Sequence, residues 1–280
     1  MLSENKIQLG FSTCPNDTFM FGSLVKGLTD FPPSDFVVLM KDIEVLNTLT
    51  LDNQLSVTKI SFASFPFIAK EYQILNAGSA LGYKNGPLLV SRYKIYPDEV
   101  KDLHIAIPGK HTTANLLLEI LFPGVLKKTS FLFSDIEDAV MDKECDAGLI
   151  IHESRFTYQK KGLILISDLG ELWEKQYDSP VPLGGIVAKR SLPYQQKKAF
   201  EKSLSESIEM AFKDPKPIWN FIKENAKGMD DGVIQAHIDL YVNDFSINIG
   251  EKGKKAIRLL FEKGTERGIL PEVPEDIFLE

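Results

Sequence analysis

Short apolar runs of strand length alternate along this chain with longer segments of helical period. This alternation is typical of βα units wound into mostly parallel sheets, so we expect an α/β fold. Several runs end in small or polar residues that open a helix, and such junctions face the ligand crevice in an open α/β sheet. The expected strands are 7–12, 36–40, 56–61, 103–108, 130–133 and 147–151.

Two Pro-containing segments resemble each other, namely 86–93 (GPLLVSRY) and 181–190 (VPLGGIVAKR). Each is typical of an extended strand that ends in a basic residue, and together they enclose about one small domain. We interpret them as paired crossings between two lobes with a ligand cleft between them. We expect lobe one to comprise 1–91 and 187–280, and lobe two to comprise 92–186.

Composition argues against several classes of partner. The net charge is -7 and no basic cluster is present, so we do not expect nucleic-acid binding. Cys14 and Cys145 lie far apart and outside metal-ligand spacing, which predicts neither a disulfide framework nor a metal site. No run approaches the roughly 18 apolar residues of a membrane span, and the first residues lack a signal-peptide pattern. We therefore expect a cytoplasmic protein without membrane insertion.

Polar residues follow two of the expected strands. Asn16 lies in the turn after the first strand, where it either caps the next helix or points into the cleft. Lys59 and Ser61 stand at the end of the third strand, in an otherwise apolar and small run. A charge there is costly without a partner, which a bound carboxylate would supply. Backbone N–H groups around Ile60 and Ser61 would add donors.

Two later junctions carry the strongest candidates. Thr112, Thr113 and the Ala114 amide fall in a first helical turn, whose unpaired donors form an anion site, although N-capping alone explains the pattern equally well. His152 follows the last expected strand directly, and an imidazole exchanges protons near neutral pH. A purely structural histidine is the alternative. The other histidines are weaker candidates: His104, His111 and His237.

Seven stretches stand in one order along the chain: STCPNDTF, EVLN, TKIS, GKHTTA, GLIIHESRFTY, PLGGIVAKR and YVNDFSINIGEKG. In this order and at these separations they resemble the 1,4-dihydroxy-6-naphthoate synthase family of the futalosine route to menaquinone. The resemblance runs from about Gly10 to Gly253 and covers most of the chain. IIHESRFTY with PLGGIVAKR is its most specific part.

The resemblance implies a two-lobed fold similar to type II periplasmic solute-binding proteins, and a lyase that needs neither cofactor nor metal. Its substrate would be cyclic de-hypoxanthinyl futalosine, cleaved to 1,4-dihydroxy-6-naphthoate and a small sugar-derived fragment. The family's proton acceptor falls on His152. From the residues alone, the adjacent Glu153 either orients the ring or is an exposed carboxylate. The family's substrate contacts fall on Lys59, Ile60, Ser61, Thr113 and Ala114, with Thr112 adjoining.

The leading hypothesis is therefore a carbon-carbon lyase that acts on a small aromatic carboxylate derivative. The alternative is a non-catalytic small-carboxylate binding protein of the same fold. A ligand-sensing regulatory domain is disfavoured because neither a helix-turn-helix segment nor a basic surface is apparent. The sequence does not indicate an oligomeric state.

Overall fold

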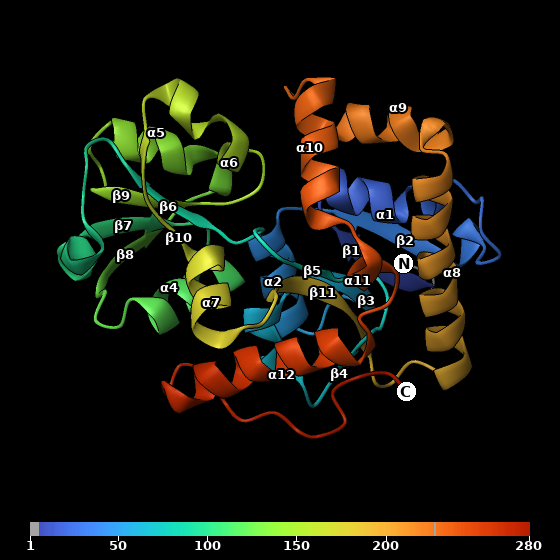
Figure 1. The fold of residues 1–280 in the computed structure, drawn as a ribbon. Coiled ribbons are helices and arrows are strands. Elements are labelled where there is room, and N and C mark those ends of the chain that lie inside the picture. Colours follow the sequence, from blue (N-terminus) through green and yellow to red (C-terminus); the bar gives the residue numbers. More distant parts are fainter. Residues whose placement is uncertain (1–5, 227) are drawn as a thin grey trace.

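The computed structural model describes residues 6–226 and 228–280, and it contains two β-sheets flanked by helices (Figure 1). The strands are β1 (Ile7–Phe11), β2 (Phe36–Met40), β3 (Val57–Ser61), β4 (Tyr72–Ile74), β5 (Ala80–Gly82), β6 (Leu88–Ser91), β7 (His104–Ile107), β8 (Lys127–Ser130), β9 (Ala147–Ile150), β10 (Ile164–Asp168) and β11 (Val181–Lys189). The α-helices are α1 (Pro15–Val25), α2 (Ile43–Leu51), α3 (Phe65–Ile68), α4 (Thr113–Leu121), α5 (Ile136–Met141), α6 (Ser154–Thr157), α7 (Leu169–Tyr177), α8 (Tyr194–Lys213), α9 (Lys216–Asn225), α10 (Asp231–Tyr241), α11 (Asp244–Ile247) and α12 (Gly250–Glu266).

Each sheet forms the centre of one lobe. The first sheet runs β2-β1-β3-β11-β4, with β5 paired to β11, and the second runs β10-β6-β9-β7-β8. Figure 1 shows the second sheet on the left with α4 to α7, and the first sheet on the right with α1 and α8 to α10. The predicted α/β class and the two-lobed arrangement are therefore confirmed.

Five of the six expected strands are present as β1, β2, β3, β7 and β9. The prediction of a strand at 130–133 is wrong, because β8 spans Lys127–Ser130 and is mostly exposed and polar. The apolar residues that suggested a strand do something else: Phe131 packs against a small core cluster, and Leu132 is 51% exposed. An edge strand without apolar alternation carries no periodic signal.

The two crossings leave the first sheet side by side, although the predicted segments 86–93 and 181–190 do not pair with each other, because β6 lies in the second sheet and β11 in the first. β5 and β11 pair in antiparallel fashion, with Val181 opposite Gly82. The division of the chain between the sheets differs from the predicted lobe boundaries at 91/92 and 186/187. β6 belongs to the second sheet because it pairs with β9 and β10, and β11 belongs to the first sheet because it pairs with β3, β4 and β5.

One apolar cluster joins the two lobes on the side opposite α10. It includes Phe62 and Phe65 next to the first sheet, and Leu117 and Trp173 on the helices of the second. Phe261 of α12 stacks on Phe65, with ring centroids 5.6 Å apart. In Figure 1, α12 runs along the lower edge of the molecule, where it covers this junction. The floor between the lobes is thus packed core.

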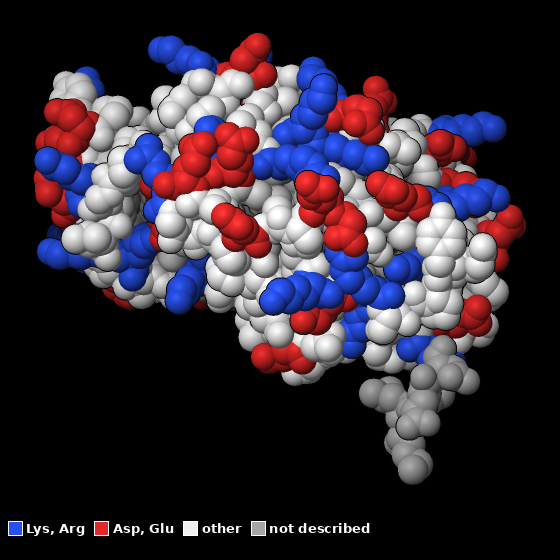
Figure 2. Space-filling model, turned by 90° about the horizontal axis from the view of Figure 1, so that it is seen from below, with Lys and Arg blue, Asp and Glu red and all other residues white. Residues whose placement is uncertain are grey.

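The face that α12 presents carries charges of both signs. Figure 2 views this lower face and shows Lys and Arg interspersed with Asp and Glu. Lys263, for example, lies 3.0 Å from Glu262 and 2.8 Å from Glu266. This side of the molecule therefore has mixed charge instead of a basic stripe.

Gly86 and Gly170 bring the first crossing against the start of α7. A Cβ on Gly86 would lie 2.3 Å from the backbone N and Cα of Gly170. We predict that Gly86→Ala lowers the free energy of unfolding by about 1–3 kcal/mol, the usual cost of overpacking. Gly232→Ala, at an exposed position of α10 with only a side-chain atom within 4 Å, should be neutral or slightly stabilising. Urea denaturation compares the two variants, and an unchanged midpoint for Gly86→Ala would contradict the close contact.

Candidate active site

A cavity lies between the two lobes, with lining residues from both. Its walls come from the ends of β3 and β9 and from the N-terminal turns of α1 and α4. The residues predicted to form the site all line it; they are Asn16, Lys59, Ile60, Ser61, Thr112, Thr113, Ala114 and His152. The roles of these residues remain predictions, but the fold does bring them together in one cavity.

Lys59 is paired within the protein. Its Nζ lies 3.4 Å from Oδ1 of Asp17 and donates to the carbonyl oxygen of Gly78 at 3.2 Å. Oδ2 of Asp17 accepts from the amide and the hydroxyl of Ser12, at 3.0 and 2.7 Å. Both charged side chains are buried, at 4% and 1% exposure. The partner that the buried Lys59 requires is therefore Asp17, and a ligand carboxylate is not needed to explain its position.

Asn16 has an acceptor free for a ligand. Its Nδ2 donates to Asp17 Oδ1 at 3.0 Å, whereas its buried Oδ1 has no partner among residues 6–226 and 228–280. No side chain caps α1, so the capping alternative for Asn16 is not observed. A buried unpaired acceptor costs about 1–3 kcal/mol, so a ligand hydroxyl that donates here would be favoured.

The EVLN stretch joins the two walls of the cavity. Asn47 is fully buried, and its Oδ1 accepts from the Ser61 amide at 2.9 Å. Glu44, one turn earlier on α2, accepts from the His111 amide at 3.0 Å across the gap between the lobes. Gly109 has φ +148°, and a Cβ there would lie 2.5 Å from Glu44 Cδ. This contact requires glycine before α4.

The N-terminus of α4 presents backbone donors to the cavity. Thr112 is the N-cap, and its hydroxyl oxygen accepts from the Asn115 amide at 3.3 Å. The Thr113 hydroxyl donates to the carbonyl oxygen of Leu183 at 2.6 Å. Both hydroxyl groups are therefore engaged in hydrogen bonds within the protein. The amides of Thr113 and Ala114, in the first turn, have no intrahelical acceptor, and donors at a helix N-terminus are of the kind that bind anions.

His152 lies directly beyond β9 with φ +56°, in the left-handed region that few non-glycine residues adopt. Its ring meets Phe133 edge-on, with centroids 4.9 Å apart, and stacks on His237 at 5.8 Å. Burial lowers the pKa of His152, and the nearby negative charge of Glu153 opposes this effect. Glu153, the expected orienting group, makes no hydrogen bond to the ring within the described part of the chain. The imidazole is therefore neutral near pH 7 and can accept a proton.

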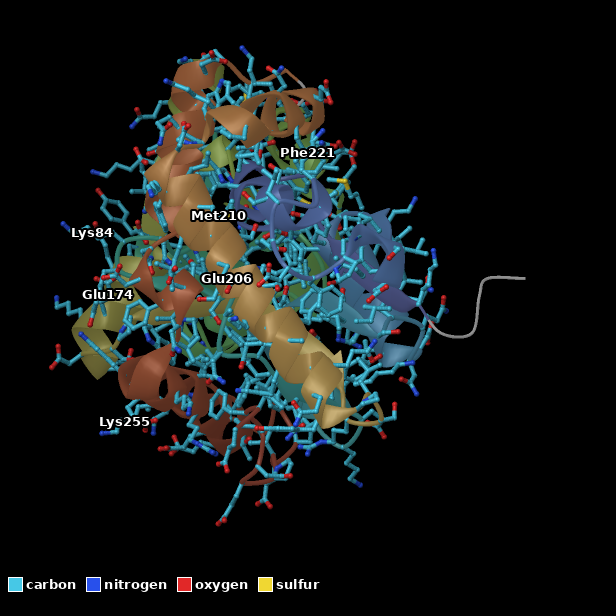
Figure 3. All side chains as sticks on the ribbon, turned by 90° about the vertical axis from the view of Figure 1, so that its right-hand side faces the viewer. Lys84, Glu174, Glu206, Met210, Phe221 and Lys255 are labelled. Carbon is cyan, nitrogen blue, oxygen red and sulfur yellow. The ribbon has the colours of Figure 1, made fainter. Side chains whose placement is uncertain are left out.

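Arg155 ties the His152 turn to the crossing between the lobes. Its guanidinium donates to the Asp168 carboxylate at 2.6 Å and to the carbonyl oxygen of Lys84 at 2.9 Å. It also donates to the carbonyl oxygen of Gly86. Lys84 lies at the edge of the molecule in Figure 3. The unusual backbone of His152 is thus held by a charge-assisted network in the next turn.

The cavity also contains residues outside the predicted set. Asp17 directly follows Asn16, so the sequence alone indicated a carboxylate beside a strand end. It did not predict the pairing of Asp17 with Lys59. Tyr241 comes from α10, far along the chain; it opens the YVNDFSINIGEKG stretch, but nothing in that stretch places it beside the strand ends. The remaining lining residues are Ser12, Ile43, Ala80, Asn85, Pro87, Ile151, Leu183 and Gly184.

Residues 6–226 and 228–280 contain neither a metal-binding cluster nor a membrane-spanning helix. No three His, Cys, Asp or Glu side chains within these ranges are grouped closely enough to hold a metal ion. None of the helices found there has the length and apolar character needed to cross a membrane.

Comparisons with known proteins identify the family of this chain. Residues 7–266 match a family model described as menaquinone biosynthesis. A 1,4-dihydroxy-6-naphthoate synthase from Thermus thermophilus is 37% identical over 273 residues, which cover 98% of this chain and 99% of the relative. A crystal structure of a protein from Archaeoglobus fulgidus superposes with a TM-score of 0.89 at 31% identity, covering 96% of this chain and 100% of that chain.

A more distant structure establishes the fold class. The ligand-binding component of an ABC-type import system from Staphylococcus aureus has a TM-score of 0.71 at 12% identity, covering 98% of this chain and 96% of that chain. At this identity the likeness concerns the fold alone. It confirms the predicted similarity to periplasmic binding proteins.

The buried ion pair can be tested by removing one charge. We predict that Asp17→Asn lowers the free energy of unfolding by about 3–5 kcal/mol, because Lys59 is then buried without a counter-charge. Glu206 of α8, labelled in Figure 3, pairs with Lys202 at 3.4 Å in a more exposed setting. Glu206→Gln should cost about 1 kcal/mol or less. Equal losses in urea denaturation at pH 7 would argue against a buried pair.

A second prediction concerns pH. Burial lowers the pKa of His152 and lowers that of His237 well below its usual value. The unfolded chain therefore binds more protons below about pH 6.5, so stability is full above that pH and falls as the pH decreases. His237→Phe should make the fall between pH 6.5 and pH 5 shallower, by up to ~1.4 kcal/mol per pH unit. Denaturation series at several pH values measure the slope, and equal slopes for variant and wild type would refute this.

Proposed function

This chain belongs to the menaquinone biosynthesis family, and we propose that it is a 1,4-dihydroxy-6-naphthoate synthase. Its substrate would be cyclic de-hypoxanthinyl futalosine, cleaved to the dihydroxynaphthoate and a small sugar-derived fragment without a cofactor or metal. The observation that carries the proposal is the position of the His152 imidazole, which a braced turn holds at the wall of an interlobe cavity.

His152 would act as the general base. Its imidazole takes a proton from a substrate carbon, and the electron pair of that C–H bond enters the ring as the carbon-carbon bond to the fragment breaks. The departing fragment takes the bonding pair and a proton, so no net oxidation occurs. Formation of the aromatic ring drives the cleavage. Positioned proton transfer contributes about 10²- to 10⁴-fold, so oriented donors in a water-poor cavity supply the remainder.

The substrate carboxylate would bind at the N-terminus of α4. The amides of Thr113 and Ala114 are free donors there, and the helix dipole favours an anion. Lys59, for which a carboxylate partner was predicted, already pairs with Asp17 and so contributes less net charge. The free acceptor of Asn16 suits a substrate hydroxyl. Ile60 and Ser61 would complete this wall of the cavity.

A non-catalytic carboxylate-binding protein is the second candidate, because the same fold occurs in ligand-binding components of import systems. The two candidates differ in one measurable respect. A binding protein would hold the cyclic substrate unchanged, whereas the synthase would release a dihydroxynaphthoate chromophore. Incubation of the purified protein with cyclic de-hypoxanthinyl futalosine separates them.

The base is tested by His152→Asn, because asparagine tolerates the left-handed backbone that alanine does not. We predict that kcat falls by at least ~10²-fold, whereas 1,4-dihydroxy-6-naphthoate still binds in a fluorescence titration. In the wild type, the acid limb of kcat/KM should lie below pH 6.5, since burial lowers the pKa of His152. His104→Asn is the control: this histidine faces Thr129 on the second sheet, away from the cavity, and activity should persist. Turnover by His152→Asn at the wild-type rate would exclude the assignment.

A further inference from the structure

Helix α10 carries an aromatic pair that the proposed reaction has not used. His237 and Tyr241 are one helical turn apart, so they share a face of the helix. Tyr241 lines the cavity and is 6% exposed. Its hydroxyl group has no hydrogen-bond partner within the described ranges of the chain. A buried phenol without a protein partner is suited to donate to a ligand.

His237 stands between Tyr241 and the proposed base. Its ring stacks on His152 with centroids 5.8 Å apart and an interplanar angle of 14°. The His237 ring also contacts the Tyr241 ring, and the centroids of these two rings are 4.7 Å apart. His237 is fully buried, and neither ring nitrogen has a partner in the described part of the chain. The three rings therefore form one packed group that joins α10 of the first lobe to the β9 turn of the second.

Three other hydroxyl groups of the cavity already donate to the protein, whereas Ser61 Oγ accepts from Asn47 Nδ2 at 3.2 Å. Ser12 donates to Asp17 at 2.7 Å, and Thr112 donates to the carbonyl oxygen of Gly109 at 2.8 Å. The Thr113 hydroxyl is used in the same way. Burial raises the pKa of Tyr241, so its hydroxyl keeps its proton across the physiological range. It is therefore available as a neutral donor beside the imidazole.

The chemistry of proton removal defines what such a donor can do. A carbon acid that an imidazole can deprotonate has a neighbouring carbonyl group, whose oxygen gains negative charge as the proton leaves. A hydrogen-bond donor aimed at that oxygen lowers the barrier, and it has most effect in a cavity with little water. The base and the donor must then reach the same substrate at a fixed separation.

We propose that the Tyr241 hydroxyl donates the hydrogen bond that stabilises the oxyanion formed when His152 deprotonates the substrate, and that His237 is a positioning residue that sets the separation of the two groups. Tyr241 keeps its proton throughout, so the stoichiometry of the reaction is unchanged. This inference rests on the proposed function, because it requires the same substrate and the same base.

Tyr241→Phe removes the donor and keeps the ring. We expect kcat to fall about 10²- to 10³-fold, the usual effect of losing one oxyanion donor. KM, and the affinity for 1,4-dihydroxy-6-naphthoate measured by fluorescence titration, should change little. Tyr72→Phe is the matched control, since Tyr72 is fully buried but donates to the carbonyl oxygen of Leu55, outside the cavity. It should lower stability and leave kcat unchanged.

The positioning role of His237 has its own test. His237→Ala should lower kcat, and His237→Phe, which restores an aromatic ring, should recover most of it. In a double-mutant cycle, His237→Ala should add little to the loss caused by Tyr241→Phe, because both variants disable the same donor. Independent, additive losses would instead indicate a general structural role and would overturn the positioning assignment.

The outcomes separate this inference from the proposed function. A wild-type protein that converts the substrate, with a Tyr241→Phe variant of equal kcat, would refute the donor and leave the synthase proposal standing. A wild-type protein that converts nothing would refute the synthase proposal itself.

Should Tyr241→Phe fail to fold, 3-fluorotyrosine at position 241 keeps the shape of the side chain and makes the phenol more acidic. We then expect the alkaline limb of kcat to move to lower pH, and an unmoved profile would overturn the inference.

Discussion

The antiparallel pairing of β5 with β11 is the constraint on which the rest of the molecule depends. It joins the first-sheet ends of the two crossings into one two-stranded link, so both connections between the lobes leave the first sheet at one place. Arg155 reinforces this link by bonding Asp168 and the backbone of the first crossing. Because the link is short, the ends of β3 and β9 and the N-termini of α1 and α4 must face one another. The position of the cavity between the lobes therefore follows from the way the two chain crossings connect them.

The electrostatics of the cavity follow from burial. Its two full charges, on Asp17 and Lys59, neutralise each other, and burial favours the neutral form of both His152 and His237. What the walls offer a ligand is therefore a set of dipoles, including the first amides of α4. Fixed dipoles in a cavity with little water interact more strongly with a developing charge than the same groups in water. A nearly charge-neutral wall can thus still favour an anionic ligand.

The strands and the predicted site could be read from the sequence because both depend on local pattern. Apolar runs locate buried strands, and in an α/β sheet their ends converge, so Lys59, Thr113 and His152 meet at one cavity. Polar or very short edge strands, such as β8 and β4, carry no such pattern. Nor does local pattern say which helix of the C-terminal part covers the cleft. The histidine on α10 therefore looked unremarkable in the sequence, although it stacks on His152 in the fold.

The division of groups between the lobes explains how a binding fold can become a catalyst. In a binding protein, closure only needs donors that match the ligand. Here the proposed base comes from the second lobe, and the proposed oxyanion donor comes from α10, which packs on α1 of the first. Neither lobe alone holds both groups, so the contact between His152 and His237 across the gap also assembles the reaction centre. The same closure that excludes water would then bring base and donor to opposite ends of one carbon acid, and binding and chemistry become a single event.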